Sequence, residues 1–539
     1  MQPRFLQIIK DSLSTKIATV AVLLFSIAGR IIQLIYFFNI RSDVAKQTIA
    51  TQNFVNGHGI SMAYAAPADI SSTFYEPLIN WPPGYSLLLA PFYKLFNGNF
   101  VAASLSLGIL AAILFIITYR RILKLLMVPL YLVNIATLVS GFMIYYFYFI
   151  CCSDAIAISL AMVAIYYSLS LLQSTDHLAK KIAGITIPLF FCGALKYLFF
   201  PVVIVIPGFL LWKGWTDRNK QLKKAGIYSL LILAITLGAM LLWQKSVSGS
   251  ATYVSETARG FYPEHLRSFF PFIPSAIISP DTVSMMIPRA IVKEASIGSG
   301  FRLVHILIFS FFIFLFLKNL FRAGIKNSSV TSSYFYLGFL LLLAITSLLV
   351  ILSLRLITDG DESWTFVEEQ RYYGLPMVLL QIALFVFYSV GRHTMSRLLR
   401  YGLIFLFILL LVETGRGVLF DAKRVSHFSK EEYSWQYEHR IQQYADSLIR
   451  SSGGSTPGIT VVAGGPFAYV NERIALYSDI PILNASINGL TDLHTSRPVI
   501  LLVTLRDEEL AGYSSFLSMH KAAGQFGNLH FFMVPIGQQ

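Results

Sequence analysis

The feature that most constrains the fold is a succession of long apolar runs. A helix needs about 20 apolar residues to cross about 30 Å of hydrocarbon. Runs near that length predict about eleven spans, near 17–39, 98–118, 125–150, 154–173, 182–196, 198–212, 225–243, 302–317, 333–356, 374–390 and 401–415. The chain is 55% hydrophobic and 13% charged, with a mean hydropathy of +0.63. This composition is too apolar for a soluble protein and predicts a polytopic α-helical membrane protein.

The basic residues predict the orientation of these spans. The formal net charge of +14 comes from Lys and Arg in short loops rather than from one stripe or arm, which disfavours nucleic acid as a partner. The N-terminus and the alternate short loops are basic, for example at Arg120-Arg121, Lys180-Lys181 and Lys223-Lys224. By the positive-inside rule the N-terminus is cytoplasmic, with a retained first span, and an odd number of spans puts the C-terminus outside. We expect a multi-pass protein of a bacterial inner membrane.

The predicted topology separates a membrane part, residues 1–416, from a soluble non-cytoplasmic part, residues 417–539. Three long outer loops follow from it, at 40–97, 244–301 and 357–373, and long loops often carry function. The C-terminal part has strand-like runs at Ile459–Ala463, Val499–Thr504 and Leu529–Pro535, and helix-like segments at Ala468–Ser478 and Glu508–His520. Strands alternating with helices predict a small α/β domain.

Two carboxylates lie at the outer ends of predicted spans. Asp43 follows the first span, and burial against lipid and aromatic side chains would raise its pKa toward that of a general base. A solvated Asp neutralised by Arg41 or Lys46 is the simpler alternative. Asp154 stands where the third span passes into the fourth with almost no loop, so it is either functional or a helix N-cap. If the two converge, they could hold a divalent cation or divide the roles of base and orienting group.

Cations and aromatic residues complete the predicted outer face. The candidates for binding a phosphate group are Lys196, Arg259, His265, Arg267 and Arg371. Each is individually more typical of an interfacial anchor. The segment from Tyr75-Glu76 to Trp81-Pro82-Pro83-Gly84-Tyr85 offers aromatic faces that suit sugar rings. An interfacial aromatic belt explains the same segment equally well.

These residues resemble a family. An Asp beyond the first span, a polar loop with Asn56-Gly57-His58-Gly59, and Trp81-Pro82-Pro83-Gly84-Tyr85 before the second span are similar to the GT-C glycosyltransferases of the protein O-mannosyltransferase and lipid A aminoarabinose transferase type. The resemblance covers approximately residues 20–215, with a weaker likeness at Glu369-Gln370-Arg371-Tyr372-Tyr373. It departs at Trp81, where several relatives carry a basic residue, and at Val44, where a second acid is absent.

The resemblance implies a GT-C-like fold and an inverting transfer of a sugar from a polyprenyl-phosphate donor on the non-cytoplasmic face. By that likeness Asp43 is the general base and Asp154 matches a second acidic position, while basic residues stabilise the departing phosphate. The residues expected to bind substrate are His58, Tyr75, Glu76, Trp81, Tyr85 and Tyr372. A divalent metal at Asp43 and Asp154 is the one cofactor considered. The acceptor is a lipid, a glycan or a protein.

Two other function classes stay open from the sequence. A transporter or flippase of a lipid-linked saccharide would need charges lining a path through the membrane, and Arg30 in the first span is the clearest candidate. A scaffold or receptor would use the C-terminal part to bind a partner. Charges gathered at one interface favour the transferase, whereas charges spaced through the bilayer favour transport.

Overall fold

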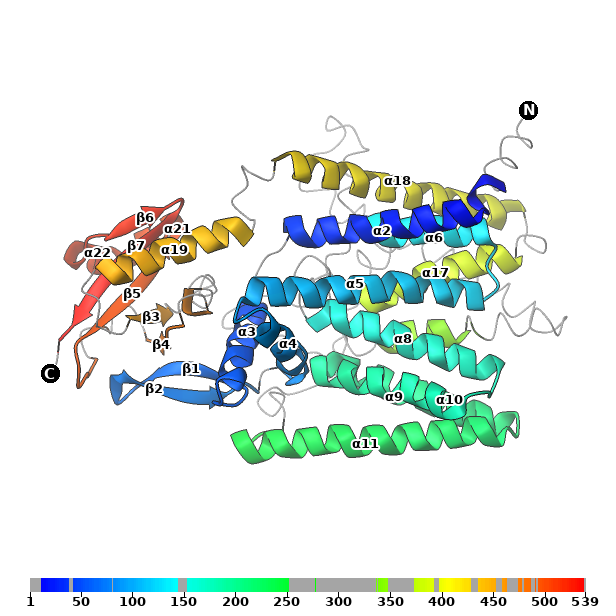
Figure 1. The fold of residues 1–539 in the computed structure, drawn as a ribbon, viewed down its shortest axis with the longest axis horizontal. Coiled ribbons are helices and arrows are strands. Elements are labelled where there is room, and N and C mark those ends of the chain that lie inside the picture. Colours follow the sequence, from blue (N-terminus) through cyan, green and yellow to red (C-terminus); the bar gives the residue numbers. More distant parts are fainter. Residues whose placement is uncertain are drawn as a thin grey trace.

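The computed structural model describes residues 11–37, 42–79, 81–143, 153–251, 277, 336, 338–347, 373–391, 397–427, 435–451, 458–462, 474–476, 479–485, 490 and 493–537. Most of these residues form a bundle of helices that run side by side (Figure 1). The bundle helices are α2 (Lys16–Phe37), α5 (Phe100–Leu125), α6 (Leu130–Phe142), α8 (Ser153–Gln173), α9 (Leu178–Leu195), α10 (Phe200–Thr216), α11 (Lys220–Ser248), α17 (Gly374–Gly391) and α18 (Arg397–His427).

Seven helices in the described part of the chain are long and apolar enough to cross a membrane. These are α2, α5, α8, α9, α10 with the short turn before it, α11 and α18. They coincide with seven of the predicted spans, so the chain is an integral membrane protein. The predicted span near 302–317 and most of that near 333–356 lie outside the described residues, so the number eleven stays a prediction.

The helix α6 is shorter than the predicted span 125–150, and its C-terminal end is bonded to Arg30 of α2. The Arg30 guanidinium is fully buried and donates hydrogen bonds to the carbonyl oxygens of Ser140 and Met143, at 2.8 and 2.7 Å. Gln33, one turn later on α2, donates to the Asp421 carboxylate of α18 at 2.8 Å. The last carbonyls of a helix have no partner within it, so Arg30 satisfies groups that would otherwise be buried without hydrogen bonds. This polar cluster joins α2, α6 and α18.

The first of the long loops that the sequence predicts, at 40–97, contains helices and strands in its described residues. It forms the helix α3 (Ser42–Val55), a hairpin of β1 (Ser61–Ala66) and β2 (Asp69–Pro77), and the helix α4 (Gly84–Leu95). In Figure 1 α3 and α4 lie at one end of the bundle with the hairpin beside them, and α2 begins at the other end of the bundle. The loop therefore connects the membrane helices to the C-terminal strands.

The hairpin shares one sheet with the C-terminal part of the chain. The seven strands are ordered β2-β1-β4-β3-β5-β7-β6, and the C-terminal strands are β3 (Gly458–Val462), β4 (Ile482–Asn484), β5 (Val499–Arg506), β6 (Gly524–Phe526) and β7 (Leu529–Ile536). β1 pairs with β4 in parallel through Tyr64 and Ile482. The three predicted strands are confirmed as β3, β5 and β7. Most of the helix-like segment 468–478 lies outside the described residues.

Both faces of β5 are buried, because side chains alternate between the faces of a strand. Leu501 and Val503 pack into one core with Phe516 and with Ile70 of the hairpin. Leu502 packs into a second core with residues of α19 (Trp435–Ser451), which lies along the sheet (Figure 1). The hairpin is thus part of the hydrophobic core of the C-terminal sheet.

Polar contacts fasten the hairpin to the same sheet. The Asp69 carboxylate accepts hydrogen bonds from the Ser496 hydroxyl and backbone N–H, at 2.5 and 3.0 Å, and from the Ser71 hydroxyl at 2.6 Å. These bonds, that from the Ser496 hydroxyl first, hold the pKa of Asp69 well below its ordinary value of 3.8. Gln52 of α3 donates to the Asp479 carboxylate at 2.8 Å. The predicted boundary at 416/417 lies within α18, and the division into two domains stays a prediction.

Candidate functional site

The helix hairpin of α8 and α9 brings a buried carboxylate and a lysine together. Asp154 lies in the first turn of α8, and Lys196 directly follows the last residue of α9 in an extended conformation. The Lys196 ammonium donates to the Asp154 carboxylate, and the two side chains are 14% and 2% exposed. A buried carboxylate is costly without a counter-charge, so this pairing explains how Asp154 can be buried at the helix end. The sequence placed both residues on one face but did not predict that they pair.

The segment from Trp81 to Ser86 is packed against the same end of α9. A Cβ atom on Gly84 would lie 2.5 Å from the carbonyl carbon of Ala194, closer than real Cβ contacts allow. Only glycine permits this approach. The start of α4 therefore lies directly against Ala194, the residue two positions before Lys196. On its other side, the Ser86 hydroxyl donates to the Gln47 carbonyl of α3 at 3.0 Å. The segment is therefore wedged between α3 and the end of α9.

Asp43 lies in the first turn of α3, partly exposed, and its helix is held to the same segment. Gln47 donates its side-chain amide to the Asp43 backbone carbonyl at 3.0 Å. The Lys46 ammonium lies 5.6 Å from the centre of the Trp81 ring, within the range of a cation–π contact. A continuous chain of contacts thus links the helix of Asp43, the Trp81–Ser86 segment, Lys196 and Asp154.

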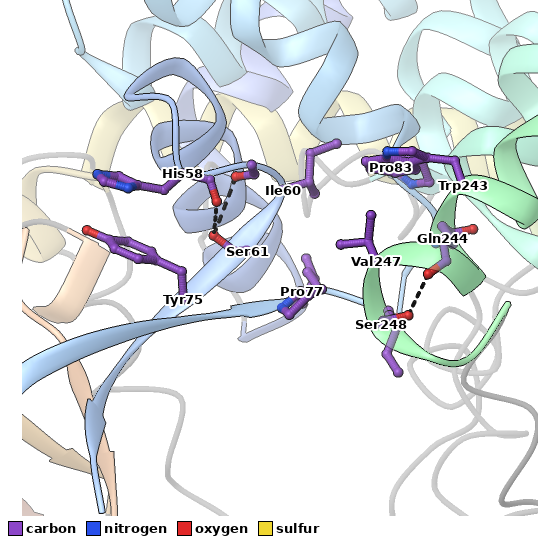
Figure 2. Close-up of a pocket in the computed structure, with 13 residues that line it drawn as sticks. His58, Ile60, Ser61, Tyr75, Pro77, Pro83, Trp243, Gln244, Val247 and Ser248 are labelled. Carbon is purple, nitrogen blue, oxygen red and sulfur yellow. Dashed lines mark hydrogen bonds between the residues drawn. The ribbon is translucent and has the colours of Figure 1, made fainter.

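A cavity of about 370 Å³ opens between the hairpin and the end of α11 (Figure 2). Its lining includes His58 and Tyr75, whose rings stack with centroids 3.9 Å apart and planes inclined by 5°. Pro83 of the wedged segment also lines it, as do Trp243 and Gln244 of α11. The Gln244 amide exchanges hydrogen bonds with the hydroxyl of Tyr197, the residue after Lys196, at 3.1 and 3.2 Å. The cavity wall is therefore bonded to the residue next to the buried ion pair.

The structure brings some of the predicted substrate-binding residues to this cavity and not others. His58 and Tyr75 line it, whereas Glu76 is exposed and follows Tyr75 on β2, so its side chain points to the opposite face of the strand. Tyr85 is 1% exposed and packs in the bundle core, so its side chain anchors the Trp81–Ser86 segment to the bundle and does not face the cavity. Trp81 is partly buried against the same core.

Five predicted residues lie outside the described part of the chain: Arg259, His265, Arg267, Arg371 and Tyr372. Sequence reasoning in turn missed four residues at the end of α11 that line the cavity: Trp243, Gln244, Val247 and Ser248. The signal was present, because Gln244 ends an apolar run next to a tryptophan. A tryptophan there is also typical of a membrane interface, which hid its position at a cavity.

The described residues add no further ligands to the divalent metal predicted at Asp43 and Asp154. Among the described residues, no group of three or more His, Cys, Asp or Glu side chains could hold an ion together. The Asp154 carboxylate is bonded to an ammonium group, which would repel a cation at the same oxygen. A divalent metal at Asp43 and Asp154 therefore stays a prediction from the sequence.

Comparisons with known proteins show what this fold resembles. No protein-family model and no curated protein sequence matches the chain. The structure is similar to the crystal structure of ArnT from Cupriavidus metallidurans in the apo state, with a TM-score of 0.56 and 12% identity over 96% of this chain and 98% of that one. It is similar to the same protein bound to undecaprenyl phosphate, with a TM-score of 0.53 and 12% identity over 96% and 97%.

A third similar structure is the archaeal oligosaccharyltransferase AglB from Archaeoglobus fulgidus, in complex with an inhibitory peptide and a dolichol-phosphate. Its TM-score is 0.51 at 10% identity, over 92% of this chain and 70% of that one. ArnT and AglB are both GT-C glycosyltransferases. At these identities the likeness shows the fold alone, and the chain has the GT-C fold over most of its length.

Proposed function

We propose that the protein is a membrane glycosyltransferase that moves a sugar from a polyprenyl-phosphate donor to an acceptor on the non-cytoplasmic face. The observation that carries the proposal is the convergence, at the end of the bundle that bears the sheet, of the helix of Asp43, the wedged segment and the Asp154–Lys196 pair. Two structures of the same fold hold undecaprenyl phosphate and a dolichol-phosphate, which supports a lipid phosphate as the carrier.

Asp43 acts as the general base in this proposal. It removes the proton from the acceptor hydroxyl or amine as that atom forms a bond to the anomeric carbon of the sugar. The bond from the anomeric carbon to the phosphate oxygen breaks on the opposite face, and its electron pair leaves with the lipid phosphate. Attack from the face opposite the leaving group inverts the anomeric centre.

Two lysines of the described residues stabilise the negative charge that develops on the phosphate. Lys196 is held at the end of α9 by Asp154, whose role is to position the ammonium group. Lys46 lies over Trp81, so it supplies a cation beside the position where related sequences carry a basic residue. Arg259, His265, Arg267, Arg371 and Tyr372 remain candidates for the same substrate on the basis of the sequence.

The test is transfer by purified protein in proteoliposomes that contain undecaprenyl-phosphate-linked sugars, offered with lipid, glycan and peptide acceptors. Release of undecaprenyl phosphate is measured, because this product is independent of the acceptor. Asp43→Asn should lower the rate by about 100-fold or more, since a general base contributes about 10² to 10⁴. The matched control is Asp176→Asn, an exposed acid in the loop between α8 and α9. Full activity of Asp43→Asn would refute the assignment.

The same proteoliposomes distinguish the transporter alternative. Arg30, the charge that most favoured transport, is bonded to the end of α6, which gives it a structural role. A transporter would move the labelled lipid-linked sugar to the inner leaflet without releasing undecaprenyl phosphate. That outcome would replace the transferase proposal.

A further inference from the structure

We infer that the cavity between the hairpin and α11 binds a neutral saccharide. The described residues that line it include no Lys, Arg, Asp or Glu. His58, stacked on Tyr75, is the one residue of this described lining that can carry a positive charge, so a phosphate or a carboxylate there would have at most one charged partner. The cations of the candidate site, Lys196 and Lys46, do not line the cavity. Its chemistry therefore suits the uncharged part of a glycosylated substrate.

Aromatic and aliphatic surfaces give the cavity walls that a sugar ring can stack on. The stacked pair of His58 and Tyr75 forms one end (Figure 2), and Trp243, 45% exposed, and Pro83 belong to the wall near α11. The faces of a pyranose ring carry C–H groups, which pack well on aromatic faces, while its hydroxyls lie around the edge. A volume of about 370 Å³ is in the range of small-molecule sites.

Polar groups that can meet sugar hydroxyls stand on the α11 side. Gln244 is 4% exposed as a whole residue, and its amide is oriented by the Tyr197 hydroxyl. The Ser248 hydroxyl donates to the Gln244 carbonyl at 2.7 Å, and its lone pairs can accept from a ligand. Few and fixed hydrogen-bonding groups within an apolar lining are typical of sites that orient a polar ligand.

The cavity also explains how saccharide binding would be coupled to the site of transfer. Gln244 is bonded to Tyr197, and Tyr197 adjoins Lys196, which pairs with Asp154. This coupling rests on the proposed function, whereas the binding of a saccharide does not. A neutral saccharide has two sources in that function, the sugar of the donor and the glycan of the acceptor.

The experiment measures binding directly. Purified full-length protein in phospholipid nanodiscs, free of sugar-headed detergent, is mixed with a panel of neutral mono- and disaccharides. Saturation-transfer NMR then reports which sugars contact the protein. At least one should give a saturable signal, and Trp243→Ala should raise its dissociation constant about five-fold or more, as expected for a lost aromatic contact in a binding site. Gln244→Ala should also weaken the binding of the same sugar.

The matched control is Trp215→Ala, which removes an exposed tryptophan at the far end of α10 and should leave the signal unchanged. No signal from any saccharide, or a signal equally unaffected by Trp243→Ala and Trp215→Ala, would overturn the inference. Neither result depends on transfer activity, so failure here is separate from failure of the proposed function.

Competition identifies the source of the saccharide. If the cavity takes the donor sugar, the undecaprenyl-phosphate-linked form of the bound sugar displaces it, while undecaprenyl phosphate alone does not. If the cavity takes the acceptor glycan, neither lipid displaces the sugar. Displacement by undecaprenyl phosphate alone would assign the cavity to the lipid phosphate and would contradict a neutral-saccharide site.

Discussion

Substitution of Gly84 by alanine should disrupt the candidate site while leaving the fold intact. The new Cβ atom would lie 2.5 Å from the Ala194 carbonyl carbon, and an ordinary contact needs 3.4 Å. The obstacle is backbone, so the start of α4 and the end of α9 must separate by about 1 Å. Overpacking of this kind costs about 1–3 kcal/mol of stability. A displacement of about 1 Å near reacting groups can lower a rate by about 100-fold.

The two effects are measured on the same purified protein. Thermal unfolding gives the loss of stability, and release of undecaprenyl phosphate in proteoliposomes gives the rate at a temperature where the variant is folded. The controls are Gly208→Ala in α10 and Gly238→Ala in α11, where a Cβ atom would meet nothing within 4 Å. Both should keep activity. If Gly84→Ala is folded and fully active, the wedge does not position Lys196 for the reaction.

Three further outcomes follow from the contacts around this site. Arg30→Met should destabilise the protein by about 3 kcal/mol, because it removes the donors to the Ser140 and Met143 carbonyls beside Asp421; an unchanged thermal midpoint would contradict this role. Asp69→Asn should lower the thermal midpoint at pH 7. The difference from the wild type should shrink as the pH falls below 3.8, because the lowered pKa of Asp69 stabilises the fold only while its carboxyl group is ionised. A constant difference in thermal midpoint from pH 7 to 3 would argue against this role. A chain that ends at residue 427 keeps α18 but loses the strands that cover Ala65 and Ile70, so limited proteolysis should cut it within 61–77, where the full-length chain resists.

The membrane helices were readable from the sequence because each is a local pattern. A run of apolar residues predicts a span without knowledge of its neighbours, and α8 and α9 follow such runs closely. The sequence predicted that Asp154 and Lys196 lie at the same end of the bundle, since two consecutive spans joined by a short loop must return to that end. It did not predict that they pair. Which carboxylate the lysine would meet depended on side-chain geometry that composition does not encode.

The long loop between α2 and α5 was the least predictable region. Its polar and aromatic composition indicated a functional loop, but the strand β1 finds its second partner in β4, on the far side of the membrane helices in the sequence. Pairing of this kind depends on tertiary packing, so local propensity predicts it weakly. The close approach of Gly84 to α9 was likewise not predictable, because the sequence Pro82-Pro83-Gly84 is typical of a turn and does not indicate a contact with another helix.

The shared sheet also sets an order of events in biosynthesis. Asp69 bonds to Ser496, and Gln52 bonds to Asp479, each across 427 residues of chain. At a synthesis rate of about 5–20 residues per second, roughly 20 to 85 s pass between synthesis of the hairpin and synthesis of these partner residues. The elements that carry Asp43 and the Trp81–Ser86 segment therefore gain these contacts only after Ser496 has been synthesised. A nascent chain that has not yet reached Ser496 would present an incomplete site, so the proposed transfer would require synthesis of the C-terminal strands first.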